Sequence, residues 1–216
     1  MAKITEDLLQ YEKELYKQGY KLIAGCDEAG RGPLCGPVVA AAVILPINYH
    51  LEGLTDSKKL TEKERNKFFV IIKKDSIAYG ISIIDNKKID EINILEASRL
   101  GMVKAINMMK IKPDYILTDA MKLPKENVLP IIKGDAKSIT IAAASVLAKV
   151  TRDRIMYEYD KIYPEYEFCK HKGYPTKLHL ENLKKYGILD IYRLTYKPVS
   201  KIWSETNEKN QQKQNV

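Results

Sequence analysis

The sequence predicts an α/β fold, in which short apolar strands alternate with amphipathic helices. Two apolar runs, "KLIAGCD" and "PVVAAAVIL", flank the turn "AGRGPLCG", a pattern typical of two strands joined as a hairpin. In residues 76–85, large apolar side chains alternate with smaller ones, as expected of a third strand. Because 216 residues are enough for one sizeable core, we expect one main domain.

A capping box marks the start of one helix. Thr61 is followed three residues later by Glu64, so a helix is expected to start near Thr61. Its buried face should include Phe68, Phe69 or Ile72. Before the core, residues 1–18 carry leucines and tyrosines among charged residues, which predicts an amphipathic surface helix.

Two long helices are expected in the middle of the chain. The first spans about 90–110 and has a stripe of mostly small residues suited to packing on a sheet: Ile94, Ala97, Ser98, Gly101, Ala105 and Met108. The second starts near Thr140, and its apolar face contains Ala143, Val146, Leu147 and Val150. On the opposite face, we expect three residues to be exposed together: Ser145, Lys149 and Arg152.

Three separate segments place a carboxylate at the end of an apolar strand or turn. These acids are Asp27 and Glu28 after "LIAGC", Asp119 at the end of "YILTD", and Asp135 after "IIKG". Acids at neighbouring strand ends converge, and their charges repel strongly in a poorly solvated cleft. Hard divalent cations with oxygen ligands relieve this repulsion, and Mg²⁺ binds through a few carboxylates while keeping waters for phosphates. The pattern therefore predicts a divalent-cation site.

Each acid also has a structural explanation when it is taken alone. Asp27 and Glu28 could start a turn, and Asp119 or Asp135 could cap a helix. The adjacent pair is harder to explain in this way, because two charges at the end of a buried strand are costly without a partner. The glycines of "GRG" let the backbone approach a ligand closely, and Arg31 between them suits a phosphate or sugar.

The charge balance favours an acidic partner. The chain has 36 Lys and Arg against 28 Asp and Glu, a net charge of +8. Residues 168–203 alone hold eight Lys or Arg against two acids, with several tyrosines and Trp203 between them. A basic, aromatic segment of this kind suits phosphate contacts and stacking on bases or sugars. A solvated, lysine-rich helix surface is the alternative interpretation.

Several other classes of protein do not fit the sequence. Cys26, Cys35 and Cys169 have no zinc-like spacing and the three histidines do not complete a ligand set, so we expect a reduced, cytoplasmic setting. The longest apolar run, 38–45, is far shorter than the roughly 20 residues that span a bilayer. The N-terminus has no apolar stretch typical of a signal peptide. The chain also lacks the GxxxxGK[ST] motif of a nucleotide-binding P-loop.

The motifs together resemble the bacterial ribonuclease HII family, the type 2 ribonucleases H. They are "GCDEAGRGPLCGPVVAAAVIL", "LTDSKKLT", "YILTDA", "IIKGDAKSITIAAASVLAKVTRDR" and "HKGYPTKLH", in the family's order and approximate spacing. The resemblance extends from about Lys21 to Lys201. It implies a ribonuclease-H-like α/β fold with a mixed central β-sheet flanked by helices and with a helical C-terminal portion.

The expected domain organisation follows from the extent of these motifs. A single catalytic domain would span residues 1–203, with an N-terminal helical extension over 1–20 and a basic helical part over about 164–203. Residues 204–216 are polar and low in complexity, and we expect this tail to be disordered.

The resemblance also implies a set of site residues. The family's metal-binding, catalytic acids match Asp27, Glu28, Asp119 and Asp135, and the cation would be Mg²⁺ or Mn²⁺. Asp153 of "TRDR" is left outside this set, because it sits well into the expected helix.

The remaining implied residues would contact the substrate. The "GRG" turn, Gly30, Arg31 and Gly32, resembles the family's sensor of the ribonucleotide 2′-hydroxyl, and Tyr174 resembles its stacking partner. This agrees with the residues themselves, because the 2′-hydroxyl distinguishes RNA from DNA and glycine frees backbone groups to reach it. Phosphate-contacting positions match Lys58, Ser145 and Lys149, for which a purely structural role is the alternative.

The implied activity is metal-dependent endonucleolytic hydrolysis by a ribonuclease H. Its substrates would be the RNA strand of RNA·DNA hybrids and duplex DNA with embedded ribonucleotides, cut on the 5′ side of the ribonucleotide by two-metal-ion hydrolysis. The products would be 3′-hydroxyl and 5′-phosphate ends, and we expect a monomer with no membrane partner. The alternatives are a non-catalytic module that binds hybrids or duplexes, and a two-metal nuclease specific for branched DNA.

Overall fold

The computed structural model describes residues 8–214, and side chains up to residue 205. The chain divides into two compact units. The sheet unit comprises the described residues up to Ala29, together with Val39–Ile83 and Ser98–Thr151. The helical unit comprises Gly30–Val38, Ile84–Ala97 and the described residues from Arg152 onward. The expected single catalytic domain over 1–203 stays a prediction.

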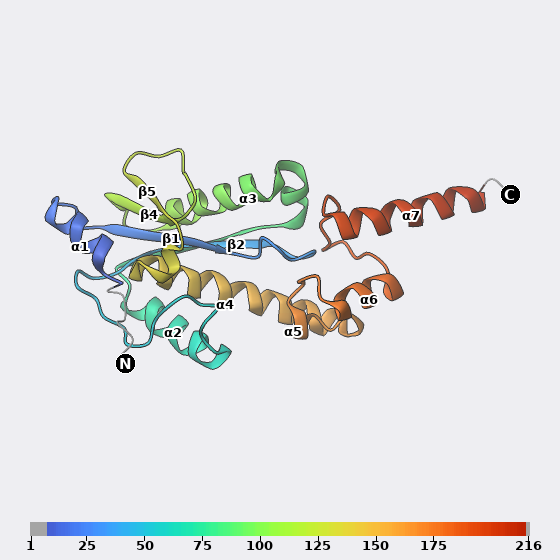
Figure 1. The fold of residues 1–216 in the computed structure, drawn as a ribbon, viewed down its shortest axis with the longest axis horizontal. Helices are drawn as coiled ribbons and strands as arrows, with labels where there is room; N and C mark the ends of the chain where they lie inside the picture. Colours follow the sequence, from blue (N-terminus) through green and yellow to red (C-terminus); the bar gives the residue numbers. More distant parts are fainter. Residues whose placement is uncertain (1–7, 215–216) are drawn as a thin grey trace. The chain divides into compact units, whose positions relative to one another are not determined.

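A five-stranded mixed sheet forms the centre of the sheet unit (Figure 1). Its strands are β1 (Ile23–Ala29), β2 (Val38–Ile44), β3 (Ala78–Ile84), β4 (Tyr115–Asp119) and β5 (Val128–Ile131), in the spatial order β3-β2-β1-β4-β5. β1 and β2 are antiparallel, which confirms the predicted hairpin, while β4 runs parallel to both β1 and β5. The sheet is therefore mixed, as expected.

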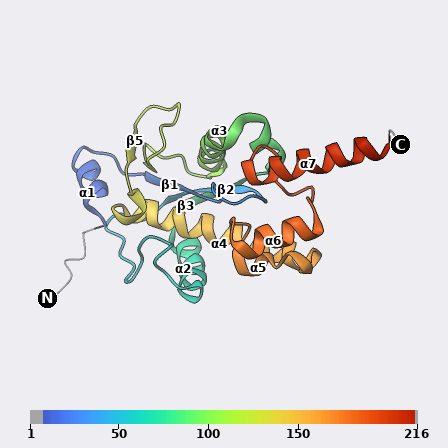
Figure 2. The ribbon, with the colours of Figure 1, turned by 45° about the vertical axis from the view of Figure 1, so that its right-hand side comes forward.

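Helices cover both faces of this sheet. On one face, the C-terminal half of α3 (Asn86–Met108) buries Met102, Ala105 and Ile106 against Cys26 and other apolar residues of β1 and β2. On the other face, α4 (Ile139–Ile162) begins directly over β1, and α2 (Glu62–Asp75) lies on the same side (Figure 2). A Cβ atom on Gly25 would lie 2.0 Å from the Thr140 backbone, so glycine lets α4 approach the strand this closely.

Two smaller expectations for the helices are confirmed. Thr61 caps α2 with the complete capping box, and Phe68, Phe69 and Ile72 are all buried. The N-terminal helix is present as α1 (Gln10–Lys17), while the part of the prediction that falls on residues 1–7 lies outside the described residues.

The long helix α3 differs from its prediction in its start and in its buried face. It begins at Asn86 rather than near residue 90, and Asn93, with φ of 65°, kinks it. Met108 is 61% exposed, whereas Met109 is buried. Both residues fit the helical period after Ala105, but the buried face is centred on Met102, Ala105, Ile106 and Met109, which share an i, i+3, i+4, i+7 spacing.

The helical unit has its own apolar core. The C-terminal part of α4 is followed by α5 (Phe168–His171), α6 (Lys177–Tyr186) and α7 (Lys197–Gln214). Their buried side chains pack with Leu34 and Cys35 and include Met156, Tyr166, Phe168, Leu183, Tyr192 and Val199. The helical C-terminal portion is thus confirmed. α7 extends to Gln214, where the polar composition had predicted a disordered tail from residue 204. Within the described residues, no helix has the length and apolarity needed to cross a membrane.

Candidate active site

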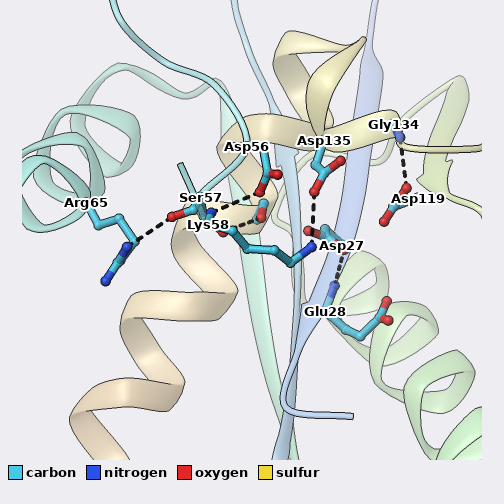
Figure 3. A network of polar contacts seen from close by, with 10 residues as sticks. Asp27, Glu28, Asp56, Ser57, Lys58, Arg65, Asp119, Gly134 and Asp135 are labelled. Carbon is cyan, nitrogen blue, oxygen red and sulfur yellow. Dashed lines mark hydrogen bonds and ion pairs between the residues drawn. The ribbon is translucent and has the colours of Figure 1, made fainter. Parts of the chain in front are cut away.

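The predicted acids gather at one end of the sheet unit's parallel strands (Figure 3). Cys26 of β1 pairs with Thr118 of the parallel strand β4. Asp27 and Asp119 are the next residues of these two strands, so they lie at the same end of the sheet. Asp135 lies in the short 3₁₀ turn Gly134–Ala136 that follows β5. The Gly134 N–H donates to Asp119 Oδ1 at 2.8 Å, which ties this turn to the end of β4.

The sequence predicts that the strand ends at Asp27 and Glu28, but both residues lie within β1, which continues to Ala29. The pairing of β1 with β2 continues to Ala29, so the two side chains point to opposite faces of the sheet. Asp27 accepts a hydrogen bond from Ser145 on α4, whereas Glu28 shares the face of Cys26, which packs in the α3 cluster. The two carboxylates therefore border the same strand end from opposite faces.

The electrostatics of these acids are mutually unfavourable. Burial raises the pKa of Asp27 well above its ordinary value, and the nearby charges of Glu28 and Asp119 raise it further. Burial also raises the pKa of Asp135, together with the charges of Asp56 and Asp119. Asp119 thus contributes to the pKa of both buried acids, which identifies one shared anionic site.

Lys58 lies among these acids. Its Nζ atom is 3.4 Å from Asp135 Oδ2 (Figure 3). Partial burial acts to lower the pKa of Lys58, but the charges of Asp135, Asp56 and Asp27 outweigh it, and the net shift is upward. The Lys58 side chain is 76% exposed, and an ion pair this open to water contributes little stability. The ammonium group can therefore leave Asp135 for another anion at small cost.

Asp56 is a member of the site that the sequence reasoning missed. Its Oδ1 atom accepts from the Lys58 N–H at 2.9 Å, and its charge raises the pKa of Asp135. The signal was available in the motif "LTDSKKLT", where the acid stands two residues before the candidate lysine. Because Lys58 interacts with both Asp56 and Asp135, this loop is part of the same charge cluster.

Ser145 is buried, which corrects the predicted exposed face of α4. The side chain is 4% exposed, and its Oγ lies 2.7 Å from Ser57 Oγ. The Arg65 guanidinium donates to the Ser57 carbonyl at 3.0 Å and to the Leu60 carbonyl, which fixes the loop that covers Ser145. Lys149, on the next turn of α4, is half-buried.

The donor chemistry of this cluster suits a hard divalent cation. Carboxylate oxygens are the ligands that Mg²⁺ and Mn²⁺ prefer, and the Asp119 charge raises the pKa of both Asp27 and Asp135. In their present orientations, no three His, Cys, Asp or Glu residues of the described chain form a group that could hold a metal ion.

The "GRG" turn and Tyr174 lie together in the helical unit. A Cβ atom on Gly32 would lie 3.4 Å from Tyr174 Cε1, so the turn and the ring are in contact distance. Gly30 has φ of +105°, and a Cβ atom there would lie 2.2 Å from Arg152 Nε. Glycine is therefore required at position 30 on both conformational and steric grounds. Arg31 is exposed, and Tyr174 is 42% exposed.

Two buried arginines donate hydrogen bonds to the backbone of this turn and of the loops around it. Arg193 donates to the carbonyls of Gly30 at 2.7 Å and Arg31 at 3.1 Å, and also to that of Gly36. Arg152, which the sequence had placed on an exposed face, is buried and donates to the carbonyls of Pro37, Lys172 and Cys35. Its burial has a structural cause, because these carbonyls come from loops that cover α4 in the helical unit.

A stacked histidine pair fixes the backbone around Tyr174. The rings of His171 and His179 are 4.1 Å apart and nearly parallel. Because the Gly173 N–H donates to His171 Nδ1, that nitrogen carries no proton. His179 Nδ1 lies 2.9 Å from the Tyr174 carbonyl, to which it can only donate. The two histidines therefore hold the peptide groups that precede Gly173 and follow Tyr174.

Most of the basic stretch 168–203 is at the surface of the helical unit. The exposed lysines are Lys170, Lys177, Lys184, Lys185, Lys197 and Lys201. Two basic residues differ: Lys172 is half-buried, and the Arg193 guanidinium is buried against the "GRG" turn. The charge pattern therefore contains both a surface component and a structural component.

Comparison with known proteins identifies the family to which this chain is similar. The family model described as Ribonuclease HII matches residues 24–199. A protein named Ribonuclease HII from Caldanaerobacter subterraneus subsp. tengcongensis is 57% identical over 196 residues, which cover 90% of this chain and 81% of the relative.

Solved structures extend the comparison to the fold. The ribonuclease H2 of Pyrococcus horikoshii OT3 is similar with a TM-score of 0.73 and 32% identity, covering 85% of this chain and 97% of that one. Bst-RNase HIII, solved in complex with Mn²⁺, is similar in fold with a TM-score of 0.69 and 16% identity, covering 88% and 71% of the two chains. The ribonuclease-H-like fold is thereby confirmed, and the chain belongs to the ribonuclease HII family.

Proposed function

We propose that this chain is an endoribonuclease that hydrolyses the RNA strand of RNA·DNA hybrids and cuts 5′ to ribonucleotides embedded in duplex DNA. Its family makes it a nuclease, a hydrolase of the ribonuclease H type. The products would be 3′-hydroxyl and 5′-phosphate ends. The single observation that carries the proposal is the cluster of acids at one sheet edge, where Asp119 affects the pKa of both Asp27 and Asp135.

The four acids Asp27, Glu28, Asp119 and Asp135 would hold Mg²⁺ or Mn²⁺. Their mutual repulsion supports this role, as does the fold similarity to a ribonuclease HIII solved with Mn²⁺. When bound, paired divalent cations lower the pKa of a water nucleophile and stabilise the departing 3′ oxygen. The chain's own part is to hold the carboxylates close together, and Ser145 orients Asp27 by its hydrogen bond.

Phosphate contacts in the sheet unit would come from Lys58 and Lys149. Lys58 has an exposed ammonium that is only weakly held by Asp135, so a substrate phosphate could replace that carboxylate as its partner. Ser145 is buried against Ser57, which supports an orienting role rather than the direct phosphate contact that the sequence suggested.

Recognition of the ribonucleotide would depend on Gly30, Arg31, Gly32 and Tyr174. The turn is held in place, because Arg193 donates to the carbonyls of Gly30 and Arg31, while the Arg31 residue is exposed. A fixed backbone that hydrogen-bonds the 2′-hydroxyl rejects a nucleotide lacking it, since the site's polar groups would then lose a partner. The half-exposed Tyr174 ring offers a stacking surface beside this turn.

The direct test uses Asp135→Asn and a labelled DNA duplex with one ribonucleotide in the presence of Mg²⁺. We expect this variant to retain duplex affinity but to lose cleavage by a factor of about 10² to 10³, as for loss of a principal electrostatic group. Asp190→Asn, which changes an exposed acid of the helical unit, should cleave like the wild type.

The outcomes separate the alternative functions. Wild-type protein that binds the duplex with Mg²⁺ or Mn²⁺ but never cuts it would support a non-catalytic binding module instead. Cleavage of an all-DNA junction, with no cleavage at the ribonucleotide, would support a nuclease specific for branched DNA.

A further inference from the structure

We propose that Glu12 of α1 is a positioning residue for Asp135. Its carboxylate fixes the start of α4 and, through it, the 3₁₀ turn that carries Asp135. The inference rests on the proposed role of Asp135 in cation binding. It assigns a function to the N-terminal helix, which carries none of the motifs that the chain shares with its family.

The carboxylate of Glu12 makes three hydrogen bonds with residues far away in the sequence. Glu12 is fully buried, and its Oε1 atom accepts from Ser138 Oγ at 2.6 Å, from Thr140 Oγ1 at 2.8 Å and from the Thr140 N–H at 3.1 Å. All three donors belong to the first turn of α4 or the residue before it. A carboxylate at this end of a helix also interacts favourably with the helix dipole.

Two further contacts attach α1 to the same region. The Ile139 N–H donates to the Leu8 carbonyl at 2.8 Å, directly beside the Glu12 contacts. Leu15, one turn after Glu12, is buried in a cluster with Leu117 of β4, Ile131 of β5 and Ile141 of α4. The helix is therefore docked on the elements that carry Asp119 and Asp135, and the carboxylate is the polar part of that interface.

Ser138 transmits this contact to the turn of Asp135. Its N–H donates to the Gly134 carbonyl at 2.9 Å, which closes the turn around Asp135. Its Oγ accepts from the Ile141 N–H at 3.2 Å and so caps α4. The Gly134 N–H donates to Asp119. Asp135 is thus held between two anchors, one to Asp119 through Gly134 and one to Glu12 through Ser138.

Burying the Glu12 carboxylate costs free energy, which its hydrogen bonds to the start of α4 partly offset. In the described part of the chain, Glu12 Oε2 is buried without a hydrogen-bond partner, and burial raises the pKa of the carboxyl despite the bonds to Ser138 and Thr140. A leucine would cover the same apolar surface at lower cost. However, it would remove the carboxylate acceptor that two hydroxyls and one N–H at the start of α4 share.

The test compares Glu12→Ala and Glu12→Gln with the matched control Glu14→Ala. Glu14 is on the same helix, and among the described residues its exposed side chain forms an ion pair with its near neighbour Lys17. Mn²⁺ binding is measured by calorimetry without nucleic acid, together with hydrogen exchange of residues 134–141 and duplex affinity without divalent ions. Thr140→Val removes one donor to Glu12 and repeats the comparison with a smaller perturbation.

We expect Glu12→Ala to weaken Mn²⁺ binding about tenfold, the lower end of the range for groups that orient metal ligands. Exchange in residues 134–141 should become faster, while duplex affinity without divalent ions stays unchanged. Glu12→Gln should restore binding to within about twofold, because its amide oxygen can accept the same hydrogen bonds. Thr140→Val should weaken binding by a smaller factor than Glu12→Ala, and Glu14→Ala should match the wild type.

Folded Glu12→Ala or Thr140→Val protein with wild-type Mn²⁺ affinity and wild-type exchange in residues 134–141 would overturn the inference. So would an equal loss of affinity in Glu14→Ala, since that would reflect general loosening of α1. Wild-type protein that binds no Mn²⁺ would overturn the proposed function instead, and the exchange comparison would then decide the role of Glu12.

Discussion

At the level of single residues, Arg193 fixes the conformation of the "GRG" turn. Its buried guanidinium donates to the carbonyls of Gly30, Arg31 and Gly36, and also to the Tyr196 hydroxyl. The Tyr196 hydroxyl in turn donates to the Arg31 carbonyl at 2.6 Å. The planar fork of arginine matches several acceptors at once, which a lysine ammonium cannot do. The shape of the "GRG" turn therefore depends on a residue more than 160 positions further along the chain.

Replacing Arg193 with methionine should impair the recognition of ribonucleotides. The carbonyls of the turn would lose their donors, so its backbone would no longer be fixed. We expect the preference for a ribonucleotide over a deoxynucleotide to fall about tenfold or more, equivalent to about 1.4 kcal/mol. Cleavage rates on matched duplexes measure this preference.

Two further variants of this test serve as controls. Arg193→Lys should recover part of the preference, because it retains a buried donor. Arg154→Met, at an exposed arginine, should leave the preference unchanged. An unchanged preference in Arg193→Met would remove this arginine from the recognition site.

Residue identities were predictable from the sequence where the chemistry is local. The three acidic segments were found because each carboxylate ends an apolar run. The burial of Ser145 and Arg152 was not predictable, because their covering partners are distant: Ser57 lies 88 residues from Ser145, and Cys35 lies 117 residues from Arg152. Helical periodicity identifies a polar face, but it does not show whether a loop covers that face.

At the scale of elements, strand and helix types followed from the sequence better than their ends did. The capping box gave the start of α2 correctly, because the two side chains that form it are local. β1 extends through Asp27 and Glu28 because its pairing with β2 outlasts the apolar run. That extension places the two acids on opposite faces of the sheet. This is a tertiary effect that local patterns do not contain.

The histidine pair between α5 and α6 should make stability sensitive to acid. Burial, followed by the neighbouring His171, lowers the pKa of His179 to about 4. Between pH 6.5 and about 4, the histidine of the unfolded chain, with a pKa of about 6.5, is protonated, whereas His179 in the folded protein stays neutral. Stability should therefore be intact above pH 6.5 and should fall as the pH drops toward 4, by about 3 kcal/mol.

The measurement is the free energy of unfolding by urea at pH 7, 6, 5 and 4, without divalent ions, for the wild type and His179→Asn. The difference between the two proteins should shrink as the pH falls, since the variant has no imidazole to charge at this position. The buried carboxyls of Asp27 and Asp135, whose pKa values are raised, contribute with the opposite sign in both proteins and cancel in this comparison. A difference that does not change with pH would contradict a neutral, buried His179.

At the scale of the whole molecule, the excess of positive charge should govern affinity for nucleic acid. The exposed lysines of the helical unit include Lys184 and Lys185 on α6. Each phosphate that a lysine neutralises releases counterions, so log affinity should fall with log salt concentration with a slope of about −3 or steeper. The double variant Lys184→Gln/Lys185→Gln should reduce the magnitude of the slope by about 1 to 2.

Fluorescence anisotropy with a labelled duplex between about 50 and 200 mM salt measures this slope. Lys63→Gln/Lys67→Gln, at exposed lysines of α2, removes the same charge elsewhere and should leave the slope closer to that of the wild type. A slope near zero for the wild type would mean that the basic stretch is a solvated surface rather than a nucleic-acid footprint.

The proposed hydrolysis, in which the clustered acids direct water to the 5′ side of a ribonucleotide, is decided by mapping the cut in a DNA duplex that carries one defined ribonucleotide, with Mg²⁺ or Mn²⁺ present. We expect a single cut immediately 5′ to the ribonucleotide, with a 3′-hydroxyl on one fragment and a 5′-phosphate on the other. A cut on the 3′ side that leaves a 2′,3′-cyclic phosphate, or no cut with either ion, would contradict it.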